Sequence, residues 1–452
     1  MQHVGYDWRM RTPIDDQQAE QRTDAHPAHD APASDERLFS ATLCADIRAR
    51  FAHVDKAPDG TPRVYMENAG GSLKVRRAVE VAADVAMRPD NAGRANPGSR
   101  EVEALIAGGR EDAALFLGAA SGLIVSDQST TANAFRVVEA AVSGQNGGRN
   151  PRQNIVTTQL EHPCTHSATK YYAQQHGLEW RVAPIVPGTG ELTARAVADR
   201  VDANTSAVAF IHASNVIGTR VDAAAVCRAI KQKNPDTLVL LDGTQHAPHG
   251  PVDVEALGVD AYCFAPYKTF SVLGTCFVWL SERLADHEHP RLTGLPLNKW
   301  ELGTRDPAAF AAWSAVVDYL VWLSGEAGEP SGDRRQCVVA AMNAIERHEA
   351  ALTRHVLRGF ESTRGLRLFG MPEADDRREA VFAITIEGLS APDLVAGLQR
   401  HGVVVHDRRH DVYNGHVLDA LEAPDCVRVS LAHYNTIQDC DALLAGLRDV
   451  SR

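Results

Sequence analysis

The stretch AYCFAPYKTFSVLGTCFVW, residues 261–279, decides the fold class of this chain. It holds two short apolar runs, Ala261–Ala265 and Cys276–Leu280, and between them a turn with Lys268 and Gly274. Such runs, rich in aromatic and β-branched residues and bounded by turn residues, predict buried strands. A lysine in apolar surroundings must be paired, neutral or covalently used, unless it snorkels from a strand end to water.

The residues before this stretch repeat the strand pattern. Predicted strands are Asn154–Thr158, Ala207–His212, Thr237–Leu241, Ala261–Ala265 and Cys276–Leu280. Ala-rich stretches with helical spacing, such as Ala223–Lys231, lie between several of them. This alternation predicts an α/β fold with a mostly parallel sheet covered by helices on both faces. Its active site should lie beyond the carboxyl ends of the strands.

Both ends of the chain differ from this middle part. Residues 1–36 carry few large apolar side chains and are predicted to form a mobile N-terminal tail. We expect a large domain over 37–330 and a small α+β C-terminal domain over 331–452. The small domain combines predicted helices and strands at Arg334–Thr363, Ala380–Ile386, Ala391–His401, Gly402–His406, Val427–Leu431 and Ile437–Val450.

Composition limits the partners. The 452 residues carry a net charge of −12, which argues against nucleic acid and anionic lipid as partners. The eight cysteines lack paired spacing and predict reduced thiols. No apolar run is expected to reach the ~20 residues of a membrane span, and the N-terminus does not resemble a secretory signal. We therefore expect a cytoplasmic protein without membrane or metal sites.

Eight motifs in register resemble the class V aminotransferase family, and within it the cysteine desulfurase-like proteins. The resemblance covers about Val64 to Leu447. It rests on Tyr65-Met-Glu-Asn-Ala-Gly-Gly, Ser129-Thr-Thr-Ala-Asn, Glu161-His, His212-Ala-Ser-Asn-Val-Ile-Gly-Thr, Asp242-Gly-Thr-Gln, Pro266-Tyr-Lys268, Glu301-Leu-Gly-Thr and Arg428-Val-Ser-Leu-Ala-His-Tyr-Asn-Thr. It implies a PLP-dependent transferase fold of type I with pyridoxal 5′-phosphate (PLP) as cofactor.

The resemblance implies a role for each matched residue around the cofactor. Lys268 would form the Schiff base, Asp242 would pair with the pyridinium nitrogen, and Gln245 would bond the phenolic oxygen. His162 would stack on the ring, with Asn215 and Tyr267 beside it. Ser129, Thr130 and Thr131 begin a helical stretch and would bind the phosphate. Alone, Asp242 and Ser129–Thr131 could equally be helix caps, and His162 a surface histidine.

Further matched residues would contact the substrate and a second subunit. Arg428 would make a bidentate contact with the substrate α-carboxylate. The alternative is an arginine that pairs with Asp425 on the surface. Asn68, Ala69 and Gly70 would line the substrate site. Thr304 would reach the phosphate of a neighbouring subunit, which implies a homodimer with a shared active site; a simple loop threonine is the alternative.

One loop departs from the desulfurases. Those enzymes need a mobile nucleophilic cysteine after the stretch that here reads Gly402-Val-Val-Val, yet His406–Leu418 holds none. His406 and Arg409, with their neighbours in this loop, could form a polar substrate pocket or a solvated surface. Cys426 is interpreted as a small buried residue. Tyr267 and Ala265 stand where the desulfurases carry histidine and a phosphate-binding serine.

The sequence thus predicts a PLP-dependent lyase or transferase acting on a small amino acid. Its leading reaction is a desulfurase-like β-elimination through a Lys268 Schiff base and a quinonoid. An aminotransferase or epimerase of the same family is the alternative, because fold alone does not choose among them. A non-catalytic scaffold is a third reading, against which the intact Lys268, Asp242 and Arg428 count.

Overall fold

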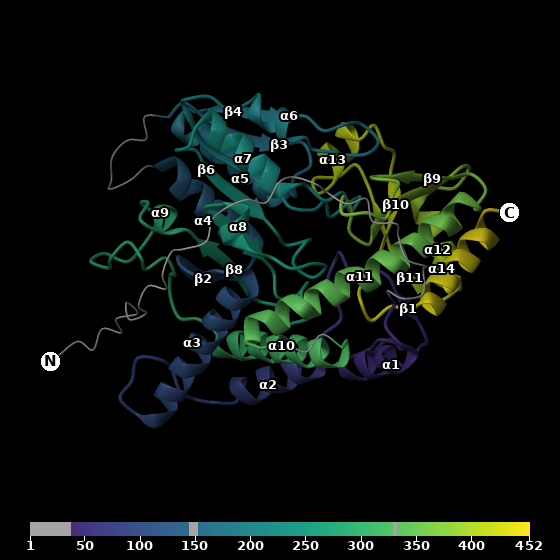
Figure 1. Cartoon of the computed structure of the whole chain (residues 1–452), viewed down its shortest axis with the longest axis horizontal. Coiled ribbons are helices and arrows are strands. Elements are labelled where there is room, and N and C mark those ends of the chain that lie inside the picture. The colour runs from purple at the N-terminus through teal and green to yellow at the C-terminus, as the bar shows by residue number, and fades with distance from the viewer. Residues whose placement is uncertain (1–37, 144–151, 329–331) are drawn as a thin grey trace, which may run out of the picture. The chain divides into compact units, whose positions relative to one another are not determined.

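The computed structural model describes residues 38–143, 152–328 and 332–452 (Figure 1). Residues Arg37–Arg452 form one compact unit by their contacts. The tail predicted over residues 1–36 lies outside the described residues. The boundary predicted between residues 330 and 331 stays a prediction.

A seven-stranded sheet organises the first two thirds of the chain. In spatial order its strands are β2 (Leu123–Asp127), β8 (Cys276–Leu280), β7 (Ala261–Phe264), β6 (Leu238–Asp242), β5 (Thr205–Ile211), β3 (Asn154–Thr158) and β4 (Glu179–Ala183). All neighbours from β7 to β4 are parallel, and only β8 runs antiparallel to both of its neighbours. The predicted α/β class with a mostly parallel sheet is therefore confirmed.

Alternate side chains of a strand point to opposite faces of the sheet. Here both faces are buried. In β5, Val208 and Phe210 enter one apolar core, whereas Ala207 and Ala209 enter another. Among the helices that contribute to these two cores are α3 (Pro97–Leu117), α4 (Thr130–Ser143), α5 (Pro163–His176), α7 (Ala223–Lys233) and α10 (Pro307–Glu326). Shorter or peripheral helices are α1 (Ala41–Arg50), α2 (Arg76–Ala86), α6 (Ala194–Ala198), α8 (Val254–Leu257) and α9 (Glu282–Ala285).

The helix α10 corrects one sequence expectation. Its 20 residues are long and apolar enough to cross a membrane by length and composition, although no such run was expected. Most of these residues are buried inside the protein, where Phe310 and Trp313 pack on aromatic side chains of the sheet. The helix also packs along α2, α3 and α11 (Figure 1). Its apolar composition is that of a core helix.

A second, antiparallel sheet follows in the order β12 (His406–Arg408), β13 (Cys426–Ser430), β10 (Val381–Ile386) and β9 (Leu366–Phe369). It shares a third apolar core with α11 (Arg334–Glu361), α12 (Ala391–Arg400) and α14 (Ile437–Val450). The helix α13 (Gly415–Ala420) lies between β12 and β13 in the chain. Figure 1 shows α11 running from α10 to α14 and so linking the two parts.

The strand predicted at Gly402–His406 is two short strands in the structure. It is divided into β11 (Val403–Val404), which pairs in parallel with β1 (Val64–Tyr65), and β12, which pairs with β13. This division moves the predicted loop: β12 extends to Arg408, and its register sets Arg408 opposite Cys426 and His406 opposite Arg428.

Strand directions place the candidate residues at one edge of the large sheet. Since β8 is antiparallel to both β2 and β7, β2 runs in the same direction as the parallel strands. The segments that follow β2, β3, β5, β6 and β7 therefore leave from the same edge. They carry Ser129–Thr131, His162, Asn215, Asp242–Gln245 and Lys268 respectively, as the carboxyl-end rule predicts.

Candidate active site

Lys268 lies in the turn after β7 with its side chain almost fully buried. Within the described part of the chain no hydrogen bond or ion pair reaches its amine. Burial, followed by the charge of Arg428, lowers the pKa of Lys268 to about 8, and the nearby Asp242 carboxylate only partly opposes this. An amine of this kind is neutral often enough near pH 7 to act as a nucleophile or base.

Lys74 was missed by the sequence reasoning, which assigned it to polar surroundings. Its amine donates to the carbonyl oxygens of Ser72, at 2.8 Å, and Tyr267, at 2.6 Å. Burial lowers the pKa of Lys74 to about 8, as for Lys268. The two lysines differ in their contacts: Lys74 is held by backbone oxygens beneath the Lys268 turn. No local pattern marks it, because the contact with Tyr267 joins segments far apart in the chain.

Asp242 ends β6 and is buried beside an unpredicted partner, Cys164. The Cys164 thiol donates to Asp242 Oδ2 at 3.6 Å, while Thr244 N donates to Asp242 Oδ1 at 3.0 Å. Burial and the Asp242 charge raise the pKa of Cys164 well above its ordinary value, so the thiol stays protonated. Asp242 thus presents a carboxylate at the sheet edge, as predicted.

His162 caps the first turn of α5 and is neutral. Its Nδ1 accepts the backbone N–H of Cys164 at 3.3 Å, which places the ring proton on Nε2. Burial, and then the charge of Lys268, lower the pKa of His162 to about 4. The electrostatic effects of Lys268, Asp242 and Arg408 on this ring indicate that it lies near them. The cap on α5, which the sequence did not predict, leaves Nε2 for a ligand.

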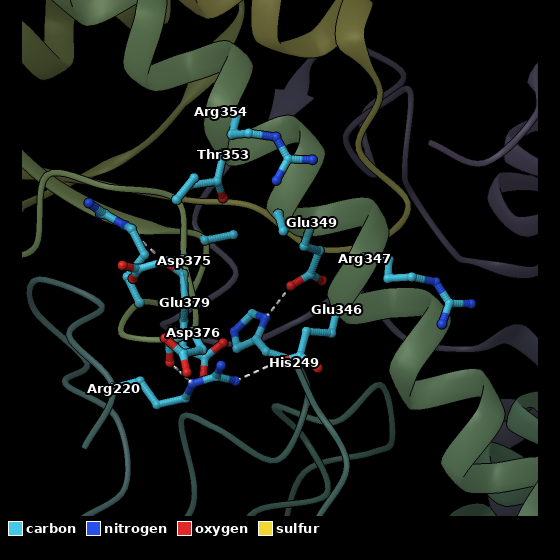
Figure 2. A pocket seen from close by; sticks show the side chains of 14 residues that line it. Arg220, His249, Glu346, Arg347, Glu349, Thr353, Arg354, Asp375, Asp376 and Glu379 are labelled. Carbon is cyan, nitrogen blue, oxygen red and sulfur yellow. Dashed lines mark hydrogen bonds and ion pairs between the residues drawn. The ribbon is translucent and has the colours of Figure 1, made fainter. Parts of the chain in front are cut away.

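Gln245 is the first member of a buried polar network that the sequence did not predict. Its Nε2 lies 3.5 Å from His249 Nε2, and His249 Nδ1 lies 2.7 Å from Glu349 Oε2 on α11. His249 and Glu349 line a cavity of about 300 Å³ together with Arg220, Glu346 and Glu379. Figure 2 shows Arg220 turned toward both Glu346 and Glu379.

One proton is shared within the His249–Glu349 pair. Burial raises the pKa of Glu349 to about 7, although His249 acts in the opposite direction. Burial alone would lower the pKa of His249, but the Glu349 carboxylate outweighs it and the pKa is raised. Both shifts favour the protonated pair near neutral pH.

Ser129, Thr130 and Thr131 begin α4 at the same edge. Ser129 Oγ accepts the N–H of Ala132 at 3.2 Å, and Thr130 Oγ1 lies 3.2 Å from Thr244 Oγ1. Ser129 and Thr131 are exposed and Thr130 is half-buried. A helix start with hydroxyl side chains can bind a phosphate through its free N–H groups, so this segment suits the predicted anion.

Arg428 is fully buried on β13 and makes two contacts. Its Nη1 donates to the Asn215 carbonyl at 2.7 Å, and its Nη2 donates to Glu67 Oε1 at 2.9 Å. Burial, then the charge of Arg408, lower the pKa of Arg428 to about 9. The alternative pairing with Asp425 is wrong, since Asp425 bonds His410 instead.

The loop residues predicted at the substrate differ in their placement. His406 is exposed and contacts Asp407, and Arg409 is exposed and pairs with Asp407 too. Arg408, between them, turns inward: its Nη2 lies 3.8 Å from Glu67 Oε1, and its charge lowers the pKa of Lys268 and, more weakly, of His162. Arg408 thus reaches the site more closely than His406 or Arg409.

Asn68, Ala69 and Gly70 lie beside β13. Asn68 Nδ2 donates to the Ser430 carbonyl at 2.8 Å, and Asn68 Oδ1 accepts from the Tyr434 hydroxyl, so this side chain is held by the protein. The Ala69 N–H donates to Ser430 Oγ at 2.9 Å. A Cβ at Gly70 would lie 2.1 Å from Glu67 Oε1, so only glycine leaves Glu67 its place.

Tyr267 and Thr304 complete the predicted set. Tyr267 is half-buried, and its ring carbons lie 3.5 Å from a Cβ built at Gly71. Thr304 is exposed. Its loop is anchored by Glu301, which accepts from the Ser126 N–H and hydroxyl, each at 2.7 Å, and from Arg110 at 2.5 Å. Because Ser126 belongs to β2, this anchor ties the loop to the strand that precedes Ser129.

The residues present fit the predicted cofactor. Asn215 Oδ1 and Gln245 Oε1 are buried without a hydrogen-bond partner, and the Lys268 amine is unbonded in the described chain. Buried polar groups are normally satisfied, so unpaired groups at one edge indicate a polar ligand. Among the described residues no cluster of three or more His, Cys, Asp or Glu side chains could hold a metal ion.

The cysteine thiols do not suit the role of a mobile nucleophile. All eight cysteines lie in the described residues and form no disulfide there, and six are buried: Cys164, Cys227, Cys263, Cys276, Cys426 and Cys440. Burial raises the pKa of Cys426, on the same strand as Arg428, to about 12. The reading of Cys426 as a small buried residue is confirmed.

Known proteins resemble this chain over most of its length. A probable cysteine desulfurase of Xylella fastidiosa (strain 9a5c) is 28% identical over 425 residues, covering 90% of this chain and 95% of that protein. A cysteine desulfurase of Yersinia pestis (strain Pestoides F) is 25% identical over 429 residues, covering 90% and 98%.

Solved structures share the fold. The apo cysteine desulfurase of Thermococcus onnurineus NA1 superposes with a TM-score of 0.76 at 20% identity, over 90% of this chain and 98% of that chain. The cysteine desulfurase CsdA of Escherichia coli gives 0.72 at 22% identity, over 92% and 98%. The family model of aminotransferase class-V proteins matches residues 64–323 and 337–443. The chain therefore belongs to the aminotransferase class-V family, a family of PLP-dependent enzymes.

Proposed function

We propose that this chain is a PLP-dependent C–S lyase that cleaves a small sulfur-containing amino acid, cysteine for example, by β-elimination. The observation that carries the proposal is the buried, unbonded Lys268 amine beside Asp242 and opposite Arg428. The likeness to proteins named cysteine desulfurases supports a sulfur-containing substrate. We further propose a cytoplasmic homodimer.

The cofactor would be held by residues at the sheet edge. Lys268 would bind it covalently, and Asp242, Gln245 and His162 would contact its ring, beside Asn215 and Tyr267. Ser129, Thr130 and Thr131 would bind its phosphate, together with Thr304 of a second subunit. When bound, PLP supplies an electron sink that stabilises negative charge at the substrate Cα.

The chain's own residues would divide the remaining work. The Arg428 fork would bind the substrate α-carboxylate and so fix the orientation of Cα. The neutral Lys268 amine would accept the Cα proton, which its lowered pKa permits near neutral pH. The overall reaction converts cysteine and water into sulfide, pyruvate and ammonia.

The proposal separates this chain from enzymes that carry sulfur on a cysteine. Such transfer needs a thiolate that reaches the substrate sulfur. The His406–Leu418 segment holds no cysteine, and the Cys426 thiol is buried and protonated. We therefore expect sulfur to leave as free sulfide.

The test is incubation with cysteine in the absence of reductant. We expect sulfide and pyruvate in equal amounts, no added sulfur on any cysteine-containing peptide by mass spectrometry, and unchanged turnover in Cys426→Ser. A persulfide on Cys426 together with lost turnover in Cys426→Ser would contradict the proposal. Exchange of the Cα proton for deuterium without sulfide release would support the aminotransferase or epimerase alternative.

A further inference from the structure

We propose that Glu67 is an internal stand-in for the substrate carboxylate, which moves from Arg428 to Arg408 when substrate binds. It would thereby restrict the site to amino acids without a second acidic group. The inference rests on the proposed function for the role of Arg428, and it adds a specificity-determining residue to that site.

The first support is the incomplete contact that Glu67 makes. The Nε–H and Nη2 groups of an arginine form one edge of its planar head and can fork onto the two oxygens of one carboxylate. Glu67 Oε1 contacts only Nη2 of Arg428, at 2.9 Å, and Arg428 Nε is buried without a partner. A substrate carboxylate that fills both positions would therefore bind Arg428 better than Glu67 does.

The second support is that Glu67 has a second place to go. Arg408 Nη2 already lies 3.8 Å from the same Oε1 atom, and Arg408 Nε is also buried without a partner. The Glu67 side chain keeps 24% of its surface exposed, in contrast to 1% for Arg428. A partly exposed side chain can change its rotamer at lower cost than a packed one.

Charge balance decides the substrate class. Two buried guanidiniums now share one carboxylate, and buried charges are costly unless each is paired. One substrate carboxylate on Arg428, with Glu67 on Arg408, pairs both arginines. A substrate with a second acidic group would have to compete with Glu67 for Arg408 and would meet its negative charge. The alternative, that Arg408 itself binds a second acidic group of the substrate, predicts the reverse preference.

The backbone around Glu67 fits this role. Glu67 bridges in parallel to Ser430, two residues beyond Arg428 on β13, which fixes its distance from the arginine. Gly70 leaves room for the carboxylate, since a Cβ there would collide with it. The backbone of this loop therefore holds the Glu67 carboxylate next to Arg428.

The experiment compares propionate with succinate as ligands of the PLP-loaded enzyme, by calorimetry and by the absorbance of the cofactor. In the unaltered protein we expect propionate to bind more tightly than succinate. In Glu67→Gln we expect propionate to bind roughly tenfold more tightly, because the competing charge-assisted bond is lost, and the discrimination against succinate to disappear. The KM for cysteine should fall by a similar factor while kcat stays unchanged. Glu67→Asp keeps the charge on a shorter stem and should show the same changes to a smaller degree.

A second substitution tests the movement itself. Arg408→Gln should weaken propionate binding roughly tenfold when Glu67 is present. In a Glu67→Gln background the loss should be clearly smaller, because only the direct attraction between the Arg408 charge and the ligand remains. The exposed Arg364→Gln in the same part of the chain is the control and should change neither ligand.

Three results would overturn the inference: unchanged or weaker propionate binding in both Glu67 variants, a preference of the unaltered protein for succinate, or an Arg408→Gln loss that is equally large without Glu67. Failure of the proposed function gives a different result. Propionate binding that Arg428→Gln does not weaken would remove Arg428 from the carboxylate site, whatever Glu67 does.

Discussion

Lys268 and Lys74 are two buried amines with the same lowered pKa, about 8, and they differ in their hydrogen bonds. Lys74 donates to two backbone carbonyl oxygens, and the Lys268 amine is free of such bonds in the described chain. A low pKa alone therefore does not identify the cofactor lysine. Geometry does, because only Lys268 lies beside Asp242 and His162 at the sheet edge.

This difference predicts the site of covalent attachment. Borohydride reduction of the PLP-loaded protein should fix the cofactor on Lys268, and Lys268→Ala should abolish the adduct completely. Lys74→Ala, the matched control, should retain the adduct on Lys268, since the Lys74 amine is turned to the backbone. Peptide mapping checks both. An adduct on Lys74 in the Lys268→Ala protein would show that the assignment is wrong.

The residues that the sequence could predict are those that follow strands in local motifs. Lys268, Asp242 and Gln245 each stand in a short pattern whose strand is also visible, so their shared edge follows from the sheet class. Glu67, Cys164 and His249 could not be found in this way. Their roles arise from partners far along the chain, such as Arg428 for Glu67 and Glu349 for His249.

At the scale of elements, β3, β8 and α14 have the bounds that their local patterns predict. The strand at Gly402–His406 does not, because it divides between two sheets. Pairing with β1 and β13 is non-local, and local apolar spacing holds no information about it. The sequence placed Arg408 and Arg409 in one loop, whereas the structure ends β12 at Arg408, which faces Glu67, and leaves Arg409 exposed.

The helix α11 contributes one ionisable pair whose pH dependence can be measured. In the folded protein the pKa of Glu349 rises from 4.5 to about 7, so its carboxyl keeps a proton that the unfolded chain loses. The pKa of His249 is raised as well, so the stabilisation by its charge is present below 6.5 and lost as pH rises through the folded value. Both shifts mean that this pair binds more protons in the folded state, so the pair's contribution to the free energy of unfolding falls as pH rises.

We expect the pair's contribution to fall between pH 5 and pH 8, by at most about 1.4 kcal/mol per pH unit for one proton. It is measured in urea unfolding as the difference in pH slope between the unaltered protein and Glu349→Gln, whose amide does not titrate. Glu361→Gln, an exposed change on the same helix, is the matched control and should leave the slope unchanged. Equal slopes in all three proteins would show that the pair does not hold the proton.

At the scale of the whole molecule, the exposed Thr304 raises the question of which subunit completes the phosphate site. Its loop is fixed to β2 through Glu301, yet Thr304 itself is exposed. An anchored loop that presents an exposed hydroxyl suits a contact made in a second subunit, since a two-fold interface brings the same loop to the partner's site. A homodimer is expected by light scattering.

Co-expression of two tagged variants decides whether Thr304 acts on its own subunit or on the partner's. One subunit carries Lys268→Ala and the other Thr304→Glu, whose charge should repel the cofactor phosphate. If Thr304 serves the partner, one of the two sites in the purified heterodimer is intact, and covalent cofactor and activity should reach about half of the unaltered level. The matched control places both substitutions on one subunit beside an unaltered one; each site then lacks one residue, and neither cofactor nor activity should remain. If Thr304 serves its own subunit, the two heterodimers must exchange these outcomes, because the control would then keep one complete site. A monomer with full turnover would remove the shared site altogether.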